Sequence, residues 1–94
     1  MIVMAYKRTV KRVLDGDTVE VNRKIGNTRY VRLANVDAPE RGTRGGTKAT
    51  NVLRGIIGGQ KISVTPVGRS YNRVVGQVRK GRKSVNKRMQ EKGY

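Results

Sequence analysis

The chain contains no cysteine, histidine, tryptophan or phenylalanine among its 94 residues. The missing cysteines and histidines exclude disulfide scaffolds, zinc fingers, cysteine nucleophiles and Ser-His triads, and they leave no imidazole that could act as a general base. No apolar run approaches the length that crosses a membrane. Any catalysis by this chain must depend on carboxylates, arginines, lysines, hydroxyls and a metal ion.

Acidic residues are also scarce, because six Asp and Glu stand against 22 Lys and Arg, which gives a formal net charge of +16. So high a positive charge on a small protein attracts polyanions, and nucleic acid is the commonest large polyanion. The charge predicts DNA or RNA as the partner, and the lack of a membrane-spanning apolar run predicts no membrane partner. The alternative is a merely basic protein that meets any anionic surface, and charge alone does not separate a binding module from an enzyme.

Valine and isoleucine total 19 residues against three leucines, and β-branched side chains favour strands. Five strand-like runs are predicted, at residues 6–14, 17–24, 28–36, 60–66 and 73–80. In the second run, alternation puts valines on one face and polar residues, Thr18, Glu20 and Asn22, on the other. Gly26–Asn27 predicts a tight turn between the second and third runs, and a Gly68-containing loop joins the last two.

One strong helical pattern lies between the third and fourth runs. The apolar residues of this stripe recur at helical spacing: Ala49, Val52, Leu53, Ile56 and Ile57. Thr47 is the expected N-cap and Gly58–Gly59 the expected end, which leaves residues 37–46 as a loop. Residues 84–94 predict one or two helical turns after a cap at Asn86. Three strands, a helix and two strands is the order of the OB-fold, so we expect a mainly β domain over residues 1–94, with one or two helices on a five-stranded Greek-key barrel.

Five of the six acidic residues lie between positions 15 and 40: Asp15, Asp17, Glu20, Asp37 and Glu40. In a chain that attracts phosphates, each of these carboxylates opposes binding unless a cation lies among them or arginines pair with them. Oxygen ligands without His or Cys suit a hard cation such as Ca²⁺ or Mg²⁺. The acidic cluster therefore predicts a divalent metal site.

Asp17 and Asp37 lie at about equal distances on either side of the turn at Gly26–Asn27. A hairpin through that turn brings both carboxylates to its open end. Strand parity points Asp17 toward the barrel interior, where a lone carboxylate is costly. Strict alternation puts Arg32 and Asp37 on opposite faces, so a shared site requires a bulge or a break at Pro39.

Residues 13–18, 31–40 and 71–73 closely resemble the motifs of the staphylococcal-nuclease-like (thermonuclease) family. The resemblance extends from about Lys11 to Tyr94. It implies an OB-fold barrel and a calcium-dependent nuclease that cleaves DNA and also RNA. By comparison with the family, the chain stops near the start of the last helix, so we expect a truncated C-terminal helix.

The resemblance also implies a role for each matching residue. Asp17 and Asp37 correspond to the metal-binding carboxylates, and Ala38 to the position whose main-chain carbonyl binds the metal. Arg32 and Arg73 correspond to the two phosphate-binding arginines of the family. Glu40 corresponds to its general base, and Tyr71 to a tyrosine near the bound nucleotide.

Two other classes of function remain open from the sequence. One is a non-catalytic OB-fold module that binds nucleic acid on the same surface, and the other is a ribosomal or structural RNA-binding protein. The enzyme is favoured over the binding module because all five residues that match the family's catalytic and metal-binding positions are present: Asp17, Asp37, Glu40, Arg32 and Arg73. A ribosomal or structural RNA-binding protein does not explain why the acidic residues are concentrated between positions 15 and 40. We expect a cytoplasmic protein if the chain is complete and a secreted one if a leader was removed.

Overall fold

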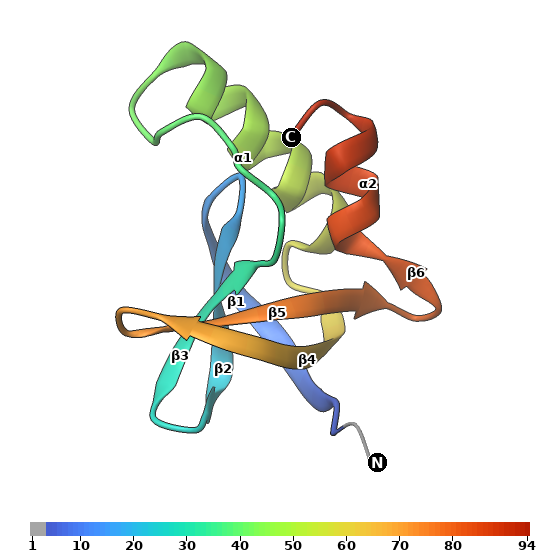
Figure 1. The fold of residues 1–94 in the computed structure, drawn as a ribbon. Helices are drawn as coiled ribbons and strands as arrows, with labels where there is room; N and C mark the ends of the chain where they lie inside the picture. The colour runs from blue at the N-terminus through green and yellow to red at the C-terminus, as the bar shows by residue number, and fades with distance from the viewer. Residues whose placement is uncertain (1–3) are drawn as a thin grey trace.

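The structure, a computed structural model, describes residues 4–94; residues 1–3 of the expected domain lie outside the described part (Figure 1). The described residues form six strands and two helices. In order along the chain they are β1 (Tyr6–Asp15), β2 (Thr18–Ile25), β3 (Thr28–Leu33), α1 (Arg44–Ile57), β4 (Lys61–Ser70), β5 (Arg73–Lys80), β6 (Lys83–Ser84) and α2 (Val85–Glu91). Within residues 4–94, neither helix has the length and apolar character needed to cross a membrane.

The strands form one sheet in the order β3-β2-β1-β4-β5-β6, and β3 also pairs with β5 in parallel. This last pairing closes β1 to β5 into a five-stranded barrel, as the OB-fold prediction requires. In Figure 1, α1 and α2 lie at one end of the barrel, and the β2–β3 hairpin turn lies at the other. The predicted mainly β architecture with two helices is confirmed.

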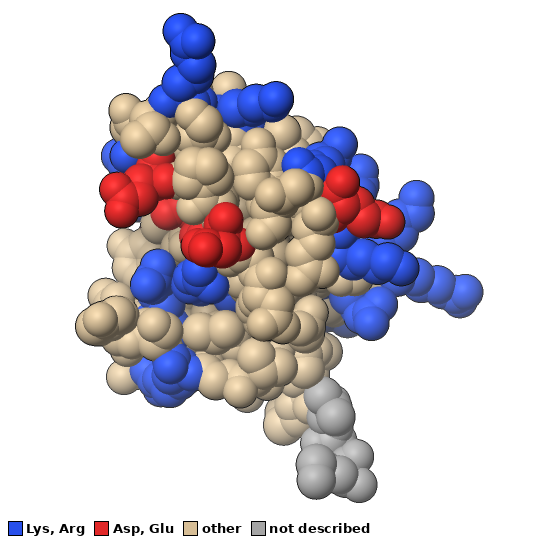
Figure 2. All heavy atoms as spheres, turned by 45° about the horizontal axis from the view of Figure 1, so that its top comes forward, with Lys and Arg blue, Asp and Glu red and all other residues tan. Residues whose placement is uncertain are grey.

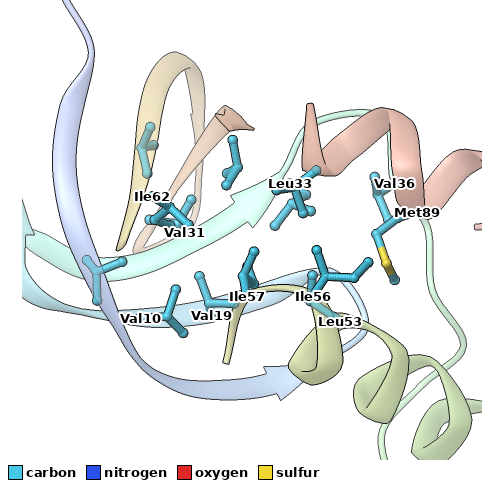
Figure 3. Close-up of a cluster of buried hydrophobic side chains, with 14 of the residues drawn as sticks. Val10, Val19, Val31, Leu33, Val36, Leu53, Ile56, Ile57, Ile62 and Met89 are labelled. Atoms are coloured by element: carbon cyan, nitrogen blue, oxygen red, sulfur yellow. The ribbon is translucent and has the colours of Figure 1, made fainter. Parts of the chain in front are cut away.

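The barrel interior is filled by β-branched side chains from the strands and is closed by α1. Leu53 and Ile57 of α1 are fully buried, and Figure 3 shows them facing the side chains of Val19 and Val31. From α2, Met89 extends the same cluster. Burial of each large aliphatic side chain contributes about 1.5–3 kcal/mol, so the apolar stripe holds α1 in place although glycine occurs within the helix.

The helix α1 begins earlier than predicted, and the assignment of Thr47 as its N-cap is wrong. Thr43 caps it instead, because its Oγ1 accepts a hydrogen bond from the N–H of Gly46 at 2.9 Å and donates one to the carbonyl of Glu40 at 2.7 Å. A side chain at Gly46 would collide with the Glu40 carbonyl. Gly46 therefore allows close packing in the first turn of α1, although it was predicted to lie in the loop of residues 37–46.

Two strand boundaries also differ from the prediction. The third strand ends at Leu33, earlier than expected, because a turn begins there. The strand β4 continues beyond Pro66 to Ser70 through an irregularity in its pairing with β5 between Pro66 and Gly68. This bulge accommodates the proline within the ladder, so Tyr71–Asn72 forms the β4–β5 turn and the expected Gly68 loop is absent from the described chain.

Asn86 is not the N-cap of α2, which is Ser84, whose Oγ accepts from the N–H of Lys87 at 3.1 Å. Asn86 is instead buried against the barrel. Its Oδ1 accepts from the N–H of Val78 at 2.8 Å, and its Nδ2 donates to the carbonyls of Ala34 at 2.9 Å and Gly76 at 3.1 Å. One side chain thus joins α2 to β5 and to the end of β3.

Replacing Asn86 tests this junction. Asn86→Ala would remove the hydrogen bonds to the N–H of Val78 and the carbonyl of Ala34, while the carbonyl of Gly76 keeps the N–H of Ala34 as a partner. We expect this loss to lower the free energy of unfolding by about 2–4 kcal/mol. Gln90→Ala is the matched control on the same helix, because exposed Gln90 makes one hydrogen bond, to the carbonyl of Asn35. Denaturant unfolding should show a loss below about 1 kcal/mol for the control. Equal midpoints for wild type and Asn86→Ala would contradict the assignment.

Candidate active site

The carboxylates predicted to hold a metal lie where the β1–β2 turn, the segment after β3 and the start of α1 meet. Asp17 closes the β1–β2 turn and is only 7% exposed. Its own N–H donates to Oδ1 of Asp15 at 3.0 Å, which fixes the turn. The predicted inward direction of Asp17 agrees with this burial.

The carboxylate of Asp17 is held from several sides. Oδ1 accepts from the hydroxyl of Thr18 at 2.9 Å, and Oδ2 accepts from the N–H of Ala38 at 3.2 Å. Burial raises the pKa of Asp17 above its ordinary value, and the hydrogen bond and negative charge of Asp15 raise it further, against the opposing hydrogen bonds of Thr18 and Ala38. A cation close to this carboxylate would stabilise its charged form.

Arg32 of β3 brings the two predicted metal ligands together. Its Nη2 lies 3.4 Å from Oδ2 of Asp17 and 3.9 Å from Oδ1 of Asp37. Both carboxylates therefore surround a single nitrogen atom and are near neighbours, as the hairpin argument predicts. Because β3 pairs with β2 on one side and β5 on the other, the main chain of Arg32 is held on both sides.

The break that places Asp37 beside Arg32 occurs at Asn35, earlier than the predicted break at Pro39. Asn35 has a φ of 60°, a left-handed conformation that asparagine tolerates better than most residues. The N–H of Val36 bonds to the carbonyl of Leu33 at 3.4 Å across this turn, and the alternation of β3 ends there. The N–H of Asp37 then bonds to the main-chain oxygen of Tyr94 at 3.0 Å, so the segment after α2 supports the loop.

These residues fit a hard divalent cation. The Asp17 side chain is 11% exposed and that of Asp37 is 96% exposed, so one carboxylate is fixed and the other faces solvent. Within residues 4–94 the acidic side chains form no cluster of three or more, so water and main-chain oxygens would complete the coordination. Ala38 lies at the site through its N–H, and the role of its carbonyl as a ligand stays a prediction.

Arg73, the first residue of β5, lies on the same face of the sheet as Arg32. In the parallel pairing, Arg32 lies opposite Val75, and residues two apart on a strand point the same way. Arg73 is half-buried. The pairing thus sets two guanidinium groups on the outer face of adjacent strands. In Figure 2, which turns the helical end of the molecule forward, acidic side chains lie in the middle of a face bordered by Lys and Arg.

Glu40 and Tyr71, the other predicted site residues, are not brought into contact with the carboxylate pair. Glu40 is exposed in the segment before α1, where only its main-chain oxygen is held, by Thr43. Tyr71 is 93% exposed at the β4–β5 turn, with a φ of 56°. It borders a separate hollow of about 380 Å³ that Tyr30 and Arg69 also line.

Two polar residues of β2, on the face predicted to lie opposite the valines, are buried. Thr18 is 3% exposed and holds Asp17; Glu20 is 7% exposed. The Nε of Arg12 donates to Oε1 of Glu20 at 2.8 Å, across the β1–β2 pairing that sets these two residues opposite each other. A search for opposite charges at facing positions of a predicted hairpin could have found this pair.

Gly16, in the β1–β2 turn, has a structural role that the sequence pattern does not single out. Its φ is not positive. A Cβ at Gly16 would lie 2.6 Å from the Cβ atoms of both Ala38 and Ala49. The small residue is needed so that the β1–β2 turn, the segment after β3 and α1 can pack together. In the sequence, only the small size of Ala38 and Ala49 hints at this close packing.

Comparison with known proteins agrees with this geometry. The family described as "Staphylococcal nuclease homologue" matches residues 30–94. An uncharacterized endonuclease of Escherichia coli is 41% identical over 70 residues, which are 73% of this chain and 45% of the relative. A micrococcal nuclease of Shigella flexneri is 42% identical over 77 residues, covering 78% of this chain and 42% of the relative.

Endonuclease YhcR of Bacillus subtilis is 33% identical over 105 residues, which cover 95% of this chain but 9% of the relative. The chain thus spans less than half the length of each of these relatives. The matched family residues include Arg32 and Asp37, which lie together at the open end of the β2–β3 hairpin, and Arg73, which lies on the strand paired with β3. The chain belongs to the staphylococcal nuclease homologue family.

Proposed function

We propose that this chain is a calcium-dependent nuclease that hydrolyses phosphodiester bonds in DNA and also in RNA. The observation that carries the proposal is the approach of Asp17 and Asp37 to one nitrogen of Arg32, which joins a cation-binding carboxylate pair to a phosphate-binding group. The endonuclease and micrococcal nuclease names of the relatives support the same reaction. Mg²⁺ is the second cation that this set of oxygen donors suits.

The arginines would bind the reacting phosphate. Arg32 and Arg73 share one face of neighbouring strands, and a guanidinium group can donate two parallel hydrogen bonds to phosphate oxygens. Negative charge increases on those oxygens in the transition state, so donors held in place beforehand stabilise it more than the ground state. Arg32 would donate to a phosphate oxygen from its place beside Asp17 and Asp37.

Glu40 would act as the general base. Without histidine, a carboxylate is the ordinary side chain that can take a proton from water near neutral pH. Its exposed position three residues after Asp37 leaves it accessible to the attacking water. Asp17, Asp37 and the carbonyl of Ala38 would hold the divalent cation, which when bound polarises the phosphate and makes a water molecule more acidic.

Replacing Glu40 tests the chemistry. We expect wild type to cleave single-stranded and duplex DNA with added Ca²⁺ or Mg²⁺ and to stop cleaving in chelator. Glu40→Gln should reduce the cleavage rate by about 10²–10⁴-fold through loss of the base. Glu91→Gln is the matched control, an exposed acid on α2, and should hydrolyse a dinucleotide, which does not extend along α2, as wild type does.

The same assay distinguishes the enzyme from a non-catalytic binding module. Tight binding of DNA or RNA with no cleavage under either cation would reject the nuclease and support the module. Cleavage that persists in chelator would reject the metal requirement.

Replacing Arg32 by lysine tests whether the planar guanidinium group is needed for cleavage. Arg32→Lys keeps the charge beside Asp17 and Asp37 but removes the planar fork, and we expect the cleavage rate to fall by about 10²–10³-fold. Arg29→Lys, at an exposed position of the same strand, should retain the wild-type rate. Circular dichroism would verify that both variants fold. Equal rates for Arg32→Lys and wild type would contradict a phosphate-binding role.

The raised pKa of Asp17 predicts how calcium affinity depends on pH. Protons compete with Ca²⁺ for this carboxylate, so affinity should fall as the pH falls, beginning above the ordinary range for aspartate. Asp15→Asn removes the neighbouring charge that raises this pKa, and the midpoint of the affinity loss should move to lower pH. Calorimetric titration of calcium at several pH values measures the midpoint. An unchanged midpoint would mean that Asp15 does not influence the ligand.

A further inference from the structure

A second concentration of positive charge lies outside the proposed catalytic residues, on β5, β6 and α2. It consists of Arg79, Arg82, Lys83, Lys87 and Arg88, which we call the α2 basic surface. These side chains border a hollow of about 620 Å³, which Glu91 also lines. Figure 2 shows Lys and Arg gathered along the right-hand edge of the molecule, the side on which Figure 1 places α2 and β6.

Within residues 4–94, the positive charges of this surface have no carboxylate partner. The ion pairs within residues 4–94 join Arg12 to Glu20 and Arg32 to Asp17 and Asp37. None of them involves a residue of β5, β6 or α2. Glu91 does not approach any of the five cations closely enough to form an ion pair. Like charges that border one hollow repel one another, and a bound polyanion would relieve this repulsion.

The α2 basic surface is connected to the proposed catalytic loop through a single short helix. Gln90 donates to the carbonyl of Asn35 at 2.9 Å, and the N–H of Asp37 bonds to the main-chain oxygen of Tyr94. Lys87 lies one helical turn before Gln90, so a rise of about 4.5 Å along α2 separates the surface from the residue that touches the loop. A strand bound at Arg32 could therefore extend over α2.

Another basic hollow, of about 540 Å³, lies on β1, β2 and β4 and includes Lys7, Arg23 and Lys61. It is less suited to extend the same strand. Lys7 is near the start of β1 and Asp15 is at its end, so the strand separates them by about 25 Å. The guanidinium of Arg8 in this hollow is occupied by the carbonyls of Arg23 and Lys24. This hollow therefore provides a comparison surface of similar charge.

We propose that the α2 basic surface binds the phosphodiester backbone of the nucleic acid strand beyond the cleaved bond. The inference rests on the proposed function for the identity of the strand. Lysine and arginine contacts to successive phosphates release counterions and do not depend on base sequence, so this surface would increase affinity for long strands without choosing among sequences. A substrate of two nucleotides would not reach it.

The test is a triple charge reversal, Arg82→Glu, Lys83→Glu and Lys87→Glu, in the full chain. All three side chains are exposed. Glu at position 87 would lie in the first turn of α2, where negative charge is favourable, and Glu at position 83 would face Lys80 across the β5–β6 pairing. The variant should therefore fold, which circular dichroism would verify.

The matched control reverses the same number of charges on the comparison surface, with Lys7→Glu, Arg23→Glu and Lys61→Glu. These side chains are also exposed, so both variants undergo the same change in net charge. Binding to a single DNA strand of about 30 nucleotides would be measured in chelator, to prevent cleavage, over a series of salt concentrations.

For the α2 variant we expect an affinity loss of about tenfold or more at low salt, and a slope of log affinity against log salt that is shallower by about two. The control variant should lose less than about threefold. Equal losses in both variants, or wild-type binding by the α2 variant, would overturn the proposal.

Hydrolysis of a dinucleotide separates this inference from the proposed function. The α2 variant should hydrolyse it at the wild-type rate, because the substrate does not extend to the surface, and a slower rate would count against the proposal. If wild type hydrolyses no substrate, the proposed function fails. The binding comparison in chelator then still decides whether the α2 basic surface contacts nucleic acid.

Discussion

The arrangement of the site depends on one guanidinium group between two carboxylates. Asp17 and Asp37 come from segments on either side of the β2–β3 hairpin, and their charges would repel each other without a cation between them. Arg32 supplies that cation from a strand that is paired on both edges. A divalent ion bound by Asp17 and Asp37 would offset their repulsion in place of Arg32, and the guanidinium group would then be available to an anion.

The two carboxylates contribute differently to such a site. Asp17 is buried and positioned by Thr18, Ala38 and the β1–β2 turn, so it is held in place before any ligand arrives. Asp37 is almost fully exposed; its N–H bonds to the main-chain oxygen of Tyr94, and its carboxylate lies 3.9 Å from Arg32. One buried and one exposed carboxylate would suit an oxygen-coordinated cation that retains bound water.

Much of this organisation was predictable because it depends on local patterns. Valine alternation, the turn at Gly26–Asn27 and the apolar stripe of α1 specified the barrel, and counting from the turn brought Asp17 to Asp37. Several of the wrong predictions involve long-range contacts. Asn86 resembles a cap in sequence, yet its amide bonds to main-chain groups of residues 34, 76 and 78, which only the folded barrel brings together. The left-handed turn at Asn35 likewise depends on support from α2.

The contact among Gly16, Ala38 and Ala49 limits how the site can change in evolution. There is no room for one additional carbon at Gly16, since it would overlap the methyl groups of both alanines. Enlarging that residue would require the turn, the loop and the helix to separate together, and Asp17 would move with them. Sequence diversification around these ligands is therefore confined to outward-facing positions, where new side chains can alter substrate preference without displacing the charged pair.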